Sequence, residues 1–189
     1  SWMLAEQVRP EDTQYIIFTS GTTSLPKAVQ LSSYSTLRDV DAVNEYLKDD
    51  WQKNCCVALP LFHSFGLVCV LLSMCNGSHT HLIRDIKPNL IRDTIVENGI
   101  ELLATVGAGY SGLTMLPDFE SKLAGRLKLC VVGGGFTTPT EMMRLENMLG
   151  GGKMLIGYGQ TECSPVISVN LPADPLERRA ISVGRILHD

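Results

Sequence analysis

The sequence predicts an α/β fold with a mostly parallel sheet and helices on both faces. Strand-like and helix-like segments alternate along the 189 residues, an order typical of such sheets. The strand-like segments are nearly continuous apolar runs, as in strands that are buried on both faces. The composition fits a folded chain, since 44% of the residues are hydrophobic and 19% are charged. We expect residues 1–189 to form a single α/β subdomain.

The N-terminal quarter is expected to hold two strands and one helix. Runs of β-branched, aromatic and apolar residues predict strands over residues 14–19 and 28–31. Ser32 or Ser33 then offers a side-chain oxygen that can cap a helix N-terminus. Four residues of that helix share one mostly apolar face by their spacing: Leu37, Val40, Asn44 and Leu47.

The middle of the chain continues the alternation of strands and helices. The expected strands are residues 54–59, 79–84, 101–105 and 127–132. Helices are expected over residues 64–76, which Gly77 ends, and from Pro88 to the stop at Gly99. Residues 107–116 are compatible with either a loop or a helix.

The last clear helix and strand lie between residues 138 and 157. Thr138 can cap a helix that Pro139 begins and that runs to Leu149. A strand is expected over residues 153–157. The tail after Pro165 carries further prolines and a charged patch, which indicate a loop.

Charge and cysteine content exclude several classes of function. The net charge is −4 and no basic stripe is present, so we expect no nucleic-acid partner. The most apolar uncharged piece, residues 65–75, is too short to span a bilayer, and no signal peptide is visible. No C-x-x-C pair is present, so the cysteines are expected to be thiols in a reducing cytoplasm: Cys55, Cys56, Cys69, Cys75, Cys130 and Cys163.

A hydroxyl-rich loop follows the first predicted strand: Thr19-Ser20-Gly21-Thr22-Thr23-Ser24-Leu25-Pro26-Lys27. Its backbone N–H groups, hydroxyls and single ammonium suit a polyphosphate. An ordinary Ser/Thr-rich turn is the alternative. A P-loop requires Gly directly before the Lys and Ser or Thr directly after it, and Pro26 and Ala28 stand there instead.

The loop resembles the phosphate loop of the adenylate-forming enzymes, which include acyl-CoA synthetases, luciferases and the adenylation domains of peptide synthetases. Ser24 and Ala28 replace two glycines of the family pattern. Three further motifs resemble the family's and follow in its order: Leu59-Pro60-Leu61-Phe62-His63-Ser64-Phe65-Gly66, Val132-Gly133-Gly134-Gly135-Phe136 and Gly157-Tyr158-Gly159-Gln160-Thr161-Glu162. In an open α/β sheet, such residues meet at the carboxyl ends of the strands.

The resemblance implies a two-step reaction in which a carboxylate attacks ATP and a thiol then takes the acyl group. It implies that the ATP phosphates are held by Thr19, Ser20, Gly21, Thr22, Thr23 and Lys27. Thr161 would donate to the α-phosphate, Glu162 would hold Mg²⁺, and His63 would lie near the acyl carboxylate. Adenine would be bordered by Gly134, Gly135, Phe136 and Tyr158.

Each assignment has a plainer alternative. Glu162 can be a solvated acid, Tyr158 a core aromatic and His63 a hydrogen-bonded loop residue. The glycines at 133–135 can simply form a tight turn between a strand and a helix.

The family pattern also indicates the substrate class. Adenylation domains for amino acids typically carry Asp at the position of His63, where it pairs with the ammonium group. An ammonium buried without that carboxylate is costly, which favours a fatty or other non-amino acid. The acceptor is expected to be the thiol of coenzyme A or of the phosphopantetheine of an acyl carrier protein.

The chain resembles a central fragment of the family's N-terminal AMP-binding domain. The later Ser/Thr-Gly-Asp segment and the C-terminal lid of the family lie outside it, so we expect little or no catalysis by this piece alone. We also expect it to self-associate through apolar surface. A nucleotide-binding module without catalysis and a module that keeps only the fold remain alternatives.

Overall fold

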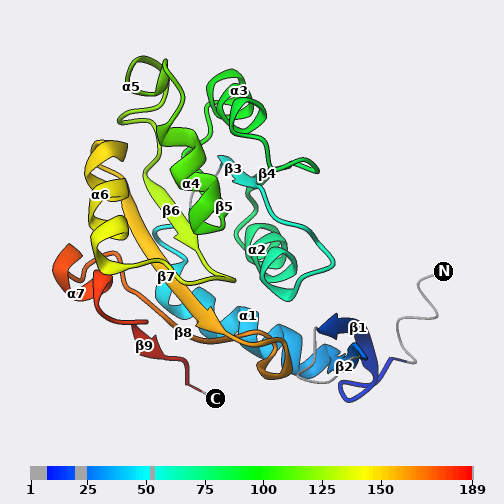
Figure 1. The fold of residues 1–189 in the computed structure, drawn as a ribbon. Helices are drawn as coiled ribbons and strands as arrows, with labels where there is room; N and C mark the ends of the chain where they lie inside the picture. Colours follow the sequence, from blue (N-terminus) through cyan, green and yellow to red (C-terminus); the bar gives the residue numbers. More distant parts are fainter. Residues whose placement is uncertain (1–7, 20–24, 52–53, 189) are drawn as a thin grey trace.

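A seven-stranded sheet with helices on both faces dominates the structure (Figure 1). The computed structural model describes residues 8–19, 25–51 and 54–188. Five neighbouring strands run parallel: β3 (Asn54–Val57), β4 (His79–Leu82), β5 (Leu102–Thr105), β6 (Leu129–Val132) and β7 (Lys153–Gly159). The predicted α/β fold with a mostly parallel sheet is therefore confirmed.

The strand order changes direction at β3. The order across the sheet is β4-β3-β5-β6-β7-β8-β9, so the chain goes from β3 to one side and then crosses to the other. Cys55 accordingly lies between Thr80 of β4 and Leu102 of β5. Open α/β sheets bind ligands outside the carboxyl ends of the strands at such a switch point. The loops after β3 and β5 are therefore the expected walls of a site.

Each face of the sheet has its own helices and its own core. One face is covered by α1 (Ser33–Leu47) and α2 (Ser64–Cys75). The other is covered by α3 (Pro88–Asn98), α4 (Gly107–Thr114), α5 (Phe119–Lys122) and α6 (Pro139–Leu149). Strand side chains alternate between the two cores, so that Cys55 and Val57 face α1 and α2 while Cys56 faces the opposite layer.

Two predicted helix N-termini are confirmed by the hydrogen bonds of their capping side chains. Ser32 accepts a hydrogen bond from the backbone N–H of Ser35 at 3.1 Å. Thr138 does the same for Glu141 at 3.2 Å. The predicted face of α1 is partly wrong, because Leu37 is 50% exposed. The buried face instead runs along Thr36, Val40, Val43 and Leu47, which are spaced by four, three and four residues, with the buried Asp39 and Ala42 beside it.

The first two strands form a separate antiparallel sheet. β1 (Thr13–Thr19) pairs with β2 (Lys27–Ser32), with Thr19 opposite Lys27. Both predicted strands are confirmed, but neither joins the parallel sheet (Figure 1). Ala28 lies in regular pairing opposite Phe18, so the backbone at this position needs no glycine.

The prediction of a loop after Pro165 is wrong. The tail forms β8 (Val166–Val169), α7 (Leu176–Ala180) and β9 (Arg185–Ile186). β8 pairs antiparallel with β7, and β9 pairs antiparallel with β8. The charged patch misled the prediction because Arg179 is fully buried rather than solvated.

Two smaller differences affect the site. β7 continues two residues beyond the predicted 157, so Tyr158 lies within the strand rather than after it. A 3₁₀ turn (Thr161–Cys163) follows. In the described ranges, no helix is both long enough and apolar enough to cross a membrane.

Candidate functional site

A cavity of about 390 Å³, called here the central cavity, lies at the carboxyl ends of β3, β5 and β7. Its walls are largely apolar and include Leu59, Phe65, Ile86, Val106 and Val166. Its polar side chains are those of His63, Ser64, Tyr158, Gln160 and Thr161. The cavity therefore combines space for a hydrocarbon with hydroxyl and imidazole groups on one side.

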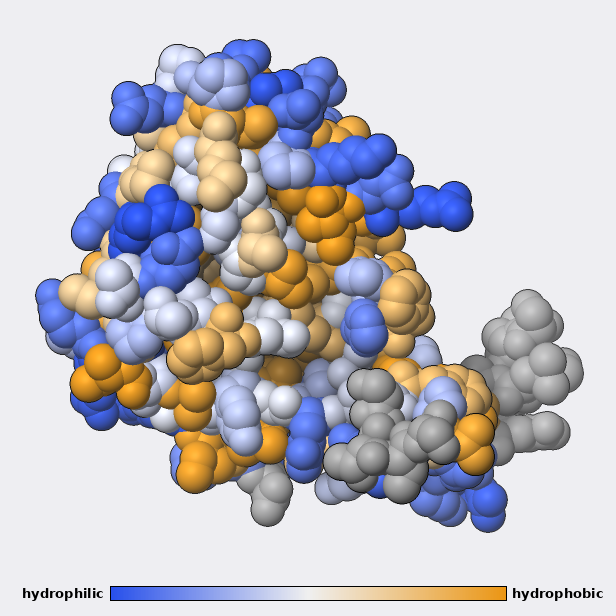
Figure 2. All heavy atoms as spheres, in the orientation of Figure 1, coloured by the Kyte–Doolittle hydropathy of each residue, from blue (hydrophilic) through white to orange (hydrophobic). Residues whose placement is uncertain are grey.

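A second cavity of about 570 Å³, called here the lateral cavity, lies beside it. It is bordered by the turn after β6, with Gly134, Gly135 and Phe136, and by residues 180–183. The two cavities share four residues of the β6 and β7 ends: Gly134, Gly157, Tyr158 and Gly159. Figure 2 shows a hollow in the middle of this face, with apolar and weakly polar residues around it and hydrophilic ones toward the outer edges.

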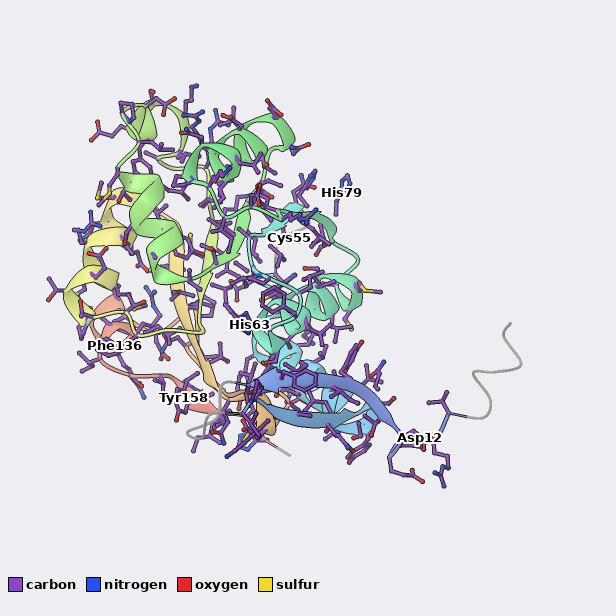
Figure 3. The ribbon with its side chains drawn as sticks, turned by 45° about the vertical axis from the view of Figure 1, so that its right-hand side comes forward. Asp12, Cys55, His63, His79, Phe136 and Tyr158 are labelled. Carbon is purple, nitrogen blue, oxygen red and sulfur yellow. The ribbon has the colours of Figure 1, made fainter. Side chains whose placement is uncertain are left out.

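Backbone geometry fixes His63 at the entrance of α2. His63 is extended (φ −100°, ψ 139°) and is the residue that precedes the first helical turn. Its N–H donates to the carbonyl of Pro60 at 3.2 Å, which closes the turn after β3. The imidazole is exposed, and its ring centre lies 4.7 Å from that of Phe62. Figure 3 shows His63, Tyr158 and Phe136 toward one end of the strands, away from Cys55 and His79.

Gly159 allows β7 to approach the segment that returns from the 3₁₀ turn. A Cβ atom at this position would lie only 1.8 Å from the carbonyl oxygen of Pro165. The turn is closed by Cys163 N–H, which donates to the carbonyl of Gln160 at 2.9 Å. Thr161 is half-buried in this turn, whereas Glu162 is exposed.

Asp39 binds the segment that follows the 3₁₀ turn. Its carboxylate on α1 accepts the N–H of Val166, at 3.2 Å and 3.4 Å to the two oxygens. Burial raises the pKa of Asp39 from 3.8 to about 8, and the Val166 N–H opposes this shift. The beginning of β8 is thus held by a carboxyl group that is only 8% exposed.

The structure brings most of the described predicted site residues together. His63, Gly134, Tyr158 and Thr161 line the central cavity, and Gly135 and Phe136 join Gly134 and Tyr158 in the lateral cavity. Phe136 and Tyr158 are 88% and 52% exposed, so Tyr158 is not the core aromatic of the alternative interpretation.

Of the described residues predicted for the site, Thr19, Lys27 and Glu162 line neither cavity. Thr19 and Lys27 face each other at the end of the β1–β2 hairpin, and β2 lies against the 3₁₀ turn that contains Glu162. Ser20, Gly21, Thr22 and Thr23 lie outside the described residues.

Several cavity residues were missed by the sequence interpretation. Ser64 directly follows His63 in a motif already identified, so its position could have been inferred. Ile86 and Val106 follow β4 and β5. Because open α/β sheets bind ligands beyond the carboxyl ends of their strands, both positions could have been inferred. Residues 181–183 had no such signal, because the tail was predicted to be a loop.

The residues around the two cavities suit a bound nucleotide better than a metal ion held by protein side chains alone. A Cβ atom at Gly135 or Gly157 would meet nothing within 4 Å, so both glycines leave space along the cavity walls. Exposed aromatic rings beside that space can stack on a base. Among the described residues, no cluster of three or more His, Cys, Asp or Glu could hold a metal ion. A Mg²⁺ ion that keeps waters and binds phosphate oxygens needs only one or two carboxylates, and Glu162 can supply one.

Comparison with known protein families gives one match over nearly the whole chain. The model described as "AMP-binding enzyme" matches residues 3–189. YngI of Bacillus subtilis, whose name assigns it provisionally to the acyl-CoA synthetases, is 30% identical over 97% of this chain and 34% of its own length. The medium-chain acyl-CoA ligase ACSF2 of Danio rerio is 29% identical over 93% of this chain and 30% of its own length. The chain thus spans about a third of the length of these relatives.

Solved structures show the same fold. The N-terminal domain of FACL13 from Mycobacterium tuberculosis superposes with a TM-score of 0.80 at 23% identity, over 94% of this chain and 44% of that one. VinN, solved in complex with L-aspartate, superposes with a TM-score of 0.80 at 27% identity, over 95% of this chain and 45% of that one.

Proposed function

The chain belongs to the AMP-binding enzyme family, and from this premise we propose that it is the nucleotide- and acid-binding part of an acid–thiol ligase. The full-length protein activates a carboxylic acid with ATP, releases pyrophosphate and transfers the acyl group to a thiol. The observation that carries this proposal is the meeting of two cavities at Tyr158, one apolar and one bordered by glycines and aromatic rings.

The lateral cavity takes the adenosine part of the nucleotide. The ring of Tyr158 stacks on adenine, and the backbone of Gly134 and Gly135 borders its edge. Stacking of this kind uses the exposed faces of aromatic rings and needs no charged side chain. Phe136 covers the outer side of the base.

The phosphates extend from the shared wall toward the 3₁₀ turn and the hairpin. Thr161 donates its hydroxyl hydrogen to the α-phosphate, where negative charge is rearranged as the carboxylate attacks. Lys27, Thr19 and the loop at 20–23 hold the β- and γ-phosphates. Glu162 holds Mg²⁺, which neutralises phosphate charge when bound.

The central cavity takes the acid. His63 lies near the carboxylate, and the apolar walls receive the carbon chain. Among the described residues that line this cavity, none is acidic, so a substrate ammonium would find no carboxylate partner. Because an unpaired buried ammonium is costly, the proposed substrate is a fatty or other non-amino acid.

The proposed acceptor is the thiol of coenzyme A, supported by the names of the acyl-CoA ligases that the chain resembles. A carrier-protein phosphopantetheine offers the same thiol and is the alternative acceptor. All six cysteines are unpaired thiols, which supports a reducing compartment such as the cytoplasm.

The test is pyrophosphate exchange into ATP by the full-length protein with a panel of fatty, aryl and amino acids. Exchange driven by a fatty or aryl acid supports the proposal. Exchange driven only by amino acids would overturn the assignment of the central cavity. For the 189-residue chain, calorimetry with Mg-ATP is expected to show binding that Lys27→Ala weakens about tenfold, as for the loss of a charged hydrogen-bond donor.

If neither binding nor an effect of Lys27→Ala is measured, a module that keeps only the fold is the better description. If the full-length protein binds ATP but exchanges no pyrophosphate with any acid, a nucleotide-binding module without catalysis is the better description.

A further inference from the structure

The hydroxyl of Ser64 meets the hydroxyl of Thr161 at the wall of the central cavity. Their oxygens lie 3.2 Å apart, and both residues line the cavity. Ser64 belongs to the first turn of α2 and Thr161 to the 3₁₀ turn, 97 positions later. The contact therefore joins the helix that begins after His63 to the turn proposed to face the phosphates.

Backbone hydrogen bonds within each segment hold Ser64 and Thr161 in place. The first turn of α2 is anchored by the Leu67 N–H, which donates to the carbonyl of His63 at 3.3 Å. The 3₁₀ turn is closed by the Ser164 N–H, which donates to the carbonyl of Thr161 at 3.2 Å. Ser64 is only 8% exposed. The pair is thus a contact between two fixed segments rather than between two mobile side chains.

The direction of this hydrogen bond decides what Thr161 can offer a ligand. A hydroxyl carries one hydrogen and two acceptor lone pairs. If Thr161 donates to Ser64, its only hydrogen is used and it can present only lone pairs to an anion. If Ser64 donates to Thr161, the Thr161 hydrogen stays available. In the described part of the chain, neither side-chain hydroxyl makes another hydrogen bond.

We propose that Ser64 is a positioning residue that donates its hydroxyl hydrogen to Thr161 Oγ1 and thereby directs the Thr161 hydrogen to the phosphate of the bound nucleotide. This inference rests on the proposed function, since it assigns a donor to the nucleotide site. An anionic phosphate accepts the Thr161 hydrogen more strongly than the Ser64 oxygen does, which selects this direction when the nucleotide is bound. Hydrogen bonds in such a chain polarise one another and strengthen the outer one.

The experiment compares AMP with adenosine, which lacks the phosphate, by calorimetry on the 189-residue chain. We expect Ser64→Ala to weaken AMP binding about fivefold to tenfold, the size of one hydrogen bond, and to leave adenosine binding unchanged. Ser64→Cys keeps the size but donates weakly, so it should resemble Ser64→Ala. Ser64→Thr keeps the hydroxyl and should restore most of the AMP affinity.

A double-mutant cycle with Thr161→Val separates positioning from folding. We expect Ser64→Ala to have no further effect on AMP binding once Thr161 has lost its hydroxyl. Equal losses of AMP and adenosine affinity, or additive losses in the cycle, would show that Ser64 acts only in packing and would overturn the inference. Unchanged AMP binding in Ser64→Ala overturns it while leaving the proposed function intact. Absence of AMP binding by the unsubstituted chain overturns both.

Discussion

Arg179 and Glu146 form a buried ion pair in which the guanidinium donates to both carboxylate oxygens, at 2.6 Å and 2.7 Å. Arg179 is fully buried and Glu146 is 8% exposed. One oxygen of Glu146 also accepts the Met154 N–H at 2.7 Å. The pair therefore ties α7 to α6 and to β7. Because residues 180–183 follow Arg179 directly, it also fixes one wall of the lateral cavity.

Removal of either charge should destabilise the fold strongly. Arg179→Met leaves the carboxylate of Glu146 buried without its partner, and such a change typically costs about 3–5 kcal/mol. The double variant Arg179→Met/Glu146→Leu removes both charges and should recover much of that loss. Urea unfolding measures the free energy of each variant.

Arg178→Ala is the matched control for this prediction. Arg178 lies next to Arg179, but its side chain is 67% exposed and its ion pair with Asp174 is loose, at 3.7 Å. We expect its loss to change the unfolding free energy by no more than about 0.5 kcal/mol. A cost for Arg179→Met as small as that for Arg178→Ala would contradict the role of the buried pair.

The same ion pair explains why the helix and strands after Pro165 were not predicted from the sequence. Apolar runs and capping residues predicted the parallel strands and most helices, because those elements are specified by local pattern. The charged patch that contains Arg179 has the local pattern of a solvated loop. Its partner Glu146 is 33 positions away, and that long-range contact carries no local signal.

Part of the lining of the candidate site could be predicted from motif patterns. His63 and Thr161 were predicted from motif patterns and both line the central cavity, while their chemical roles stay predictions. Asp39 was missed because its function depends on where α1 lies relative to Val166. A lone Asp on a helix is normally a solvated residue, and only the tertiary packing shows that it is buried.

Asp39 should make the stability of the chain depend on pH. Its pKa of about 8 in the fold exceeds the ordinary 3.8, so the folded state binds more protons than the unfolded state between these values. Stability from this group is therefore greatest below about pH 4 and falls as the pH rises toward 8. Asp39→Asn does not titrate and can still accept the Val166 N–H. At pH 8 we expect this variant to be more stable than the parent by on the order of 3 kcal/mol.

Urea unfolding of both proteins from pH 4 to pH 9 measures this difference. The titratable or charged side chains that line the same cavity as Asp39 are Tyr34, Arg38, Cys163 and His188. His188→Gln is the control that removes the imidazole of that cavity and should leave the slope due to Asp39 in place. Parallel pH curves for Asp39→Asn and the parent would refute the prediction.

The isolated chain should self-associate through the apolar side of the β1–β2 hairpin. Ile16, Phe18 and Phe62 are 57%, 66% and 73% exposed, and all three border one shallow cavity. Apolar side chains gathered in this way favour burial against another surface. Light scattering is expected to show a mass above that of the monomer, which Phe18→Ser/Phe62→Ser reduces. Met115→Ser changes a residue elsewhere that is even more exposed, at 81%, and should have no effect. A monomer at high concentration would count against this surface.

Two glycines of β7 should respond in opposite ways to an added side chain. A Cβ atom at Gly157 meets nothing within 4 Å, whereas one at Gly159 lies 1.8 Å from the Pro165 carbonyl oxygen. Gly157→Val should therefore fold with nearly unchanged stability, since valine also favours a strand. Gly159→Ala must move the segment that follows the 3₁₀ turn, at a cost of about 1–3 kcal/mol.

The same pair of variants tests the proposed ligand sites, because both glycines line the wall that the two cavities share. Gly157 lies where the two cavities join, so a valine there narrows the space for a long carbon chain. We expect Gly157→Val to weaken the binding of a long fatty acid more than that of a short one. Gly159→Ala displaces the turn that holds Thr161 and should weaken AMP binding together with stability. Calorimetry with AMP and with acids of two lengths, beside urea unfolding, measures all of these quantities. Equal losses for long and short acids in Gly157→Val would mean that the central cavity does not receive the carbon chain at this wall.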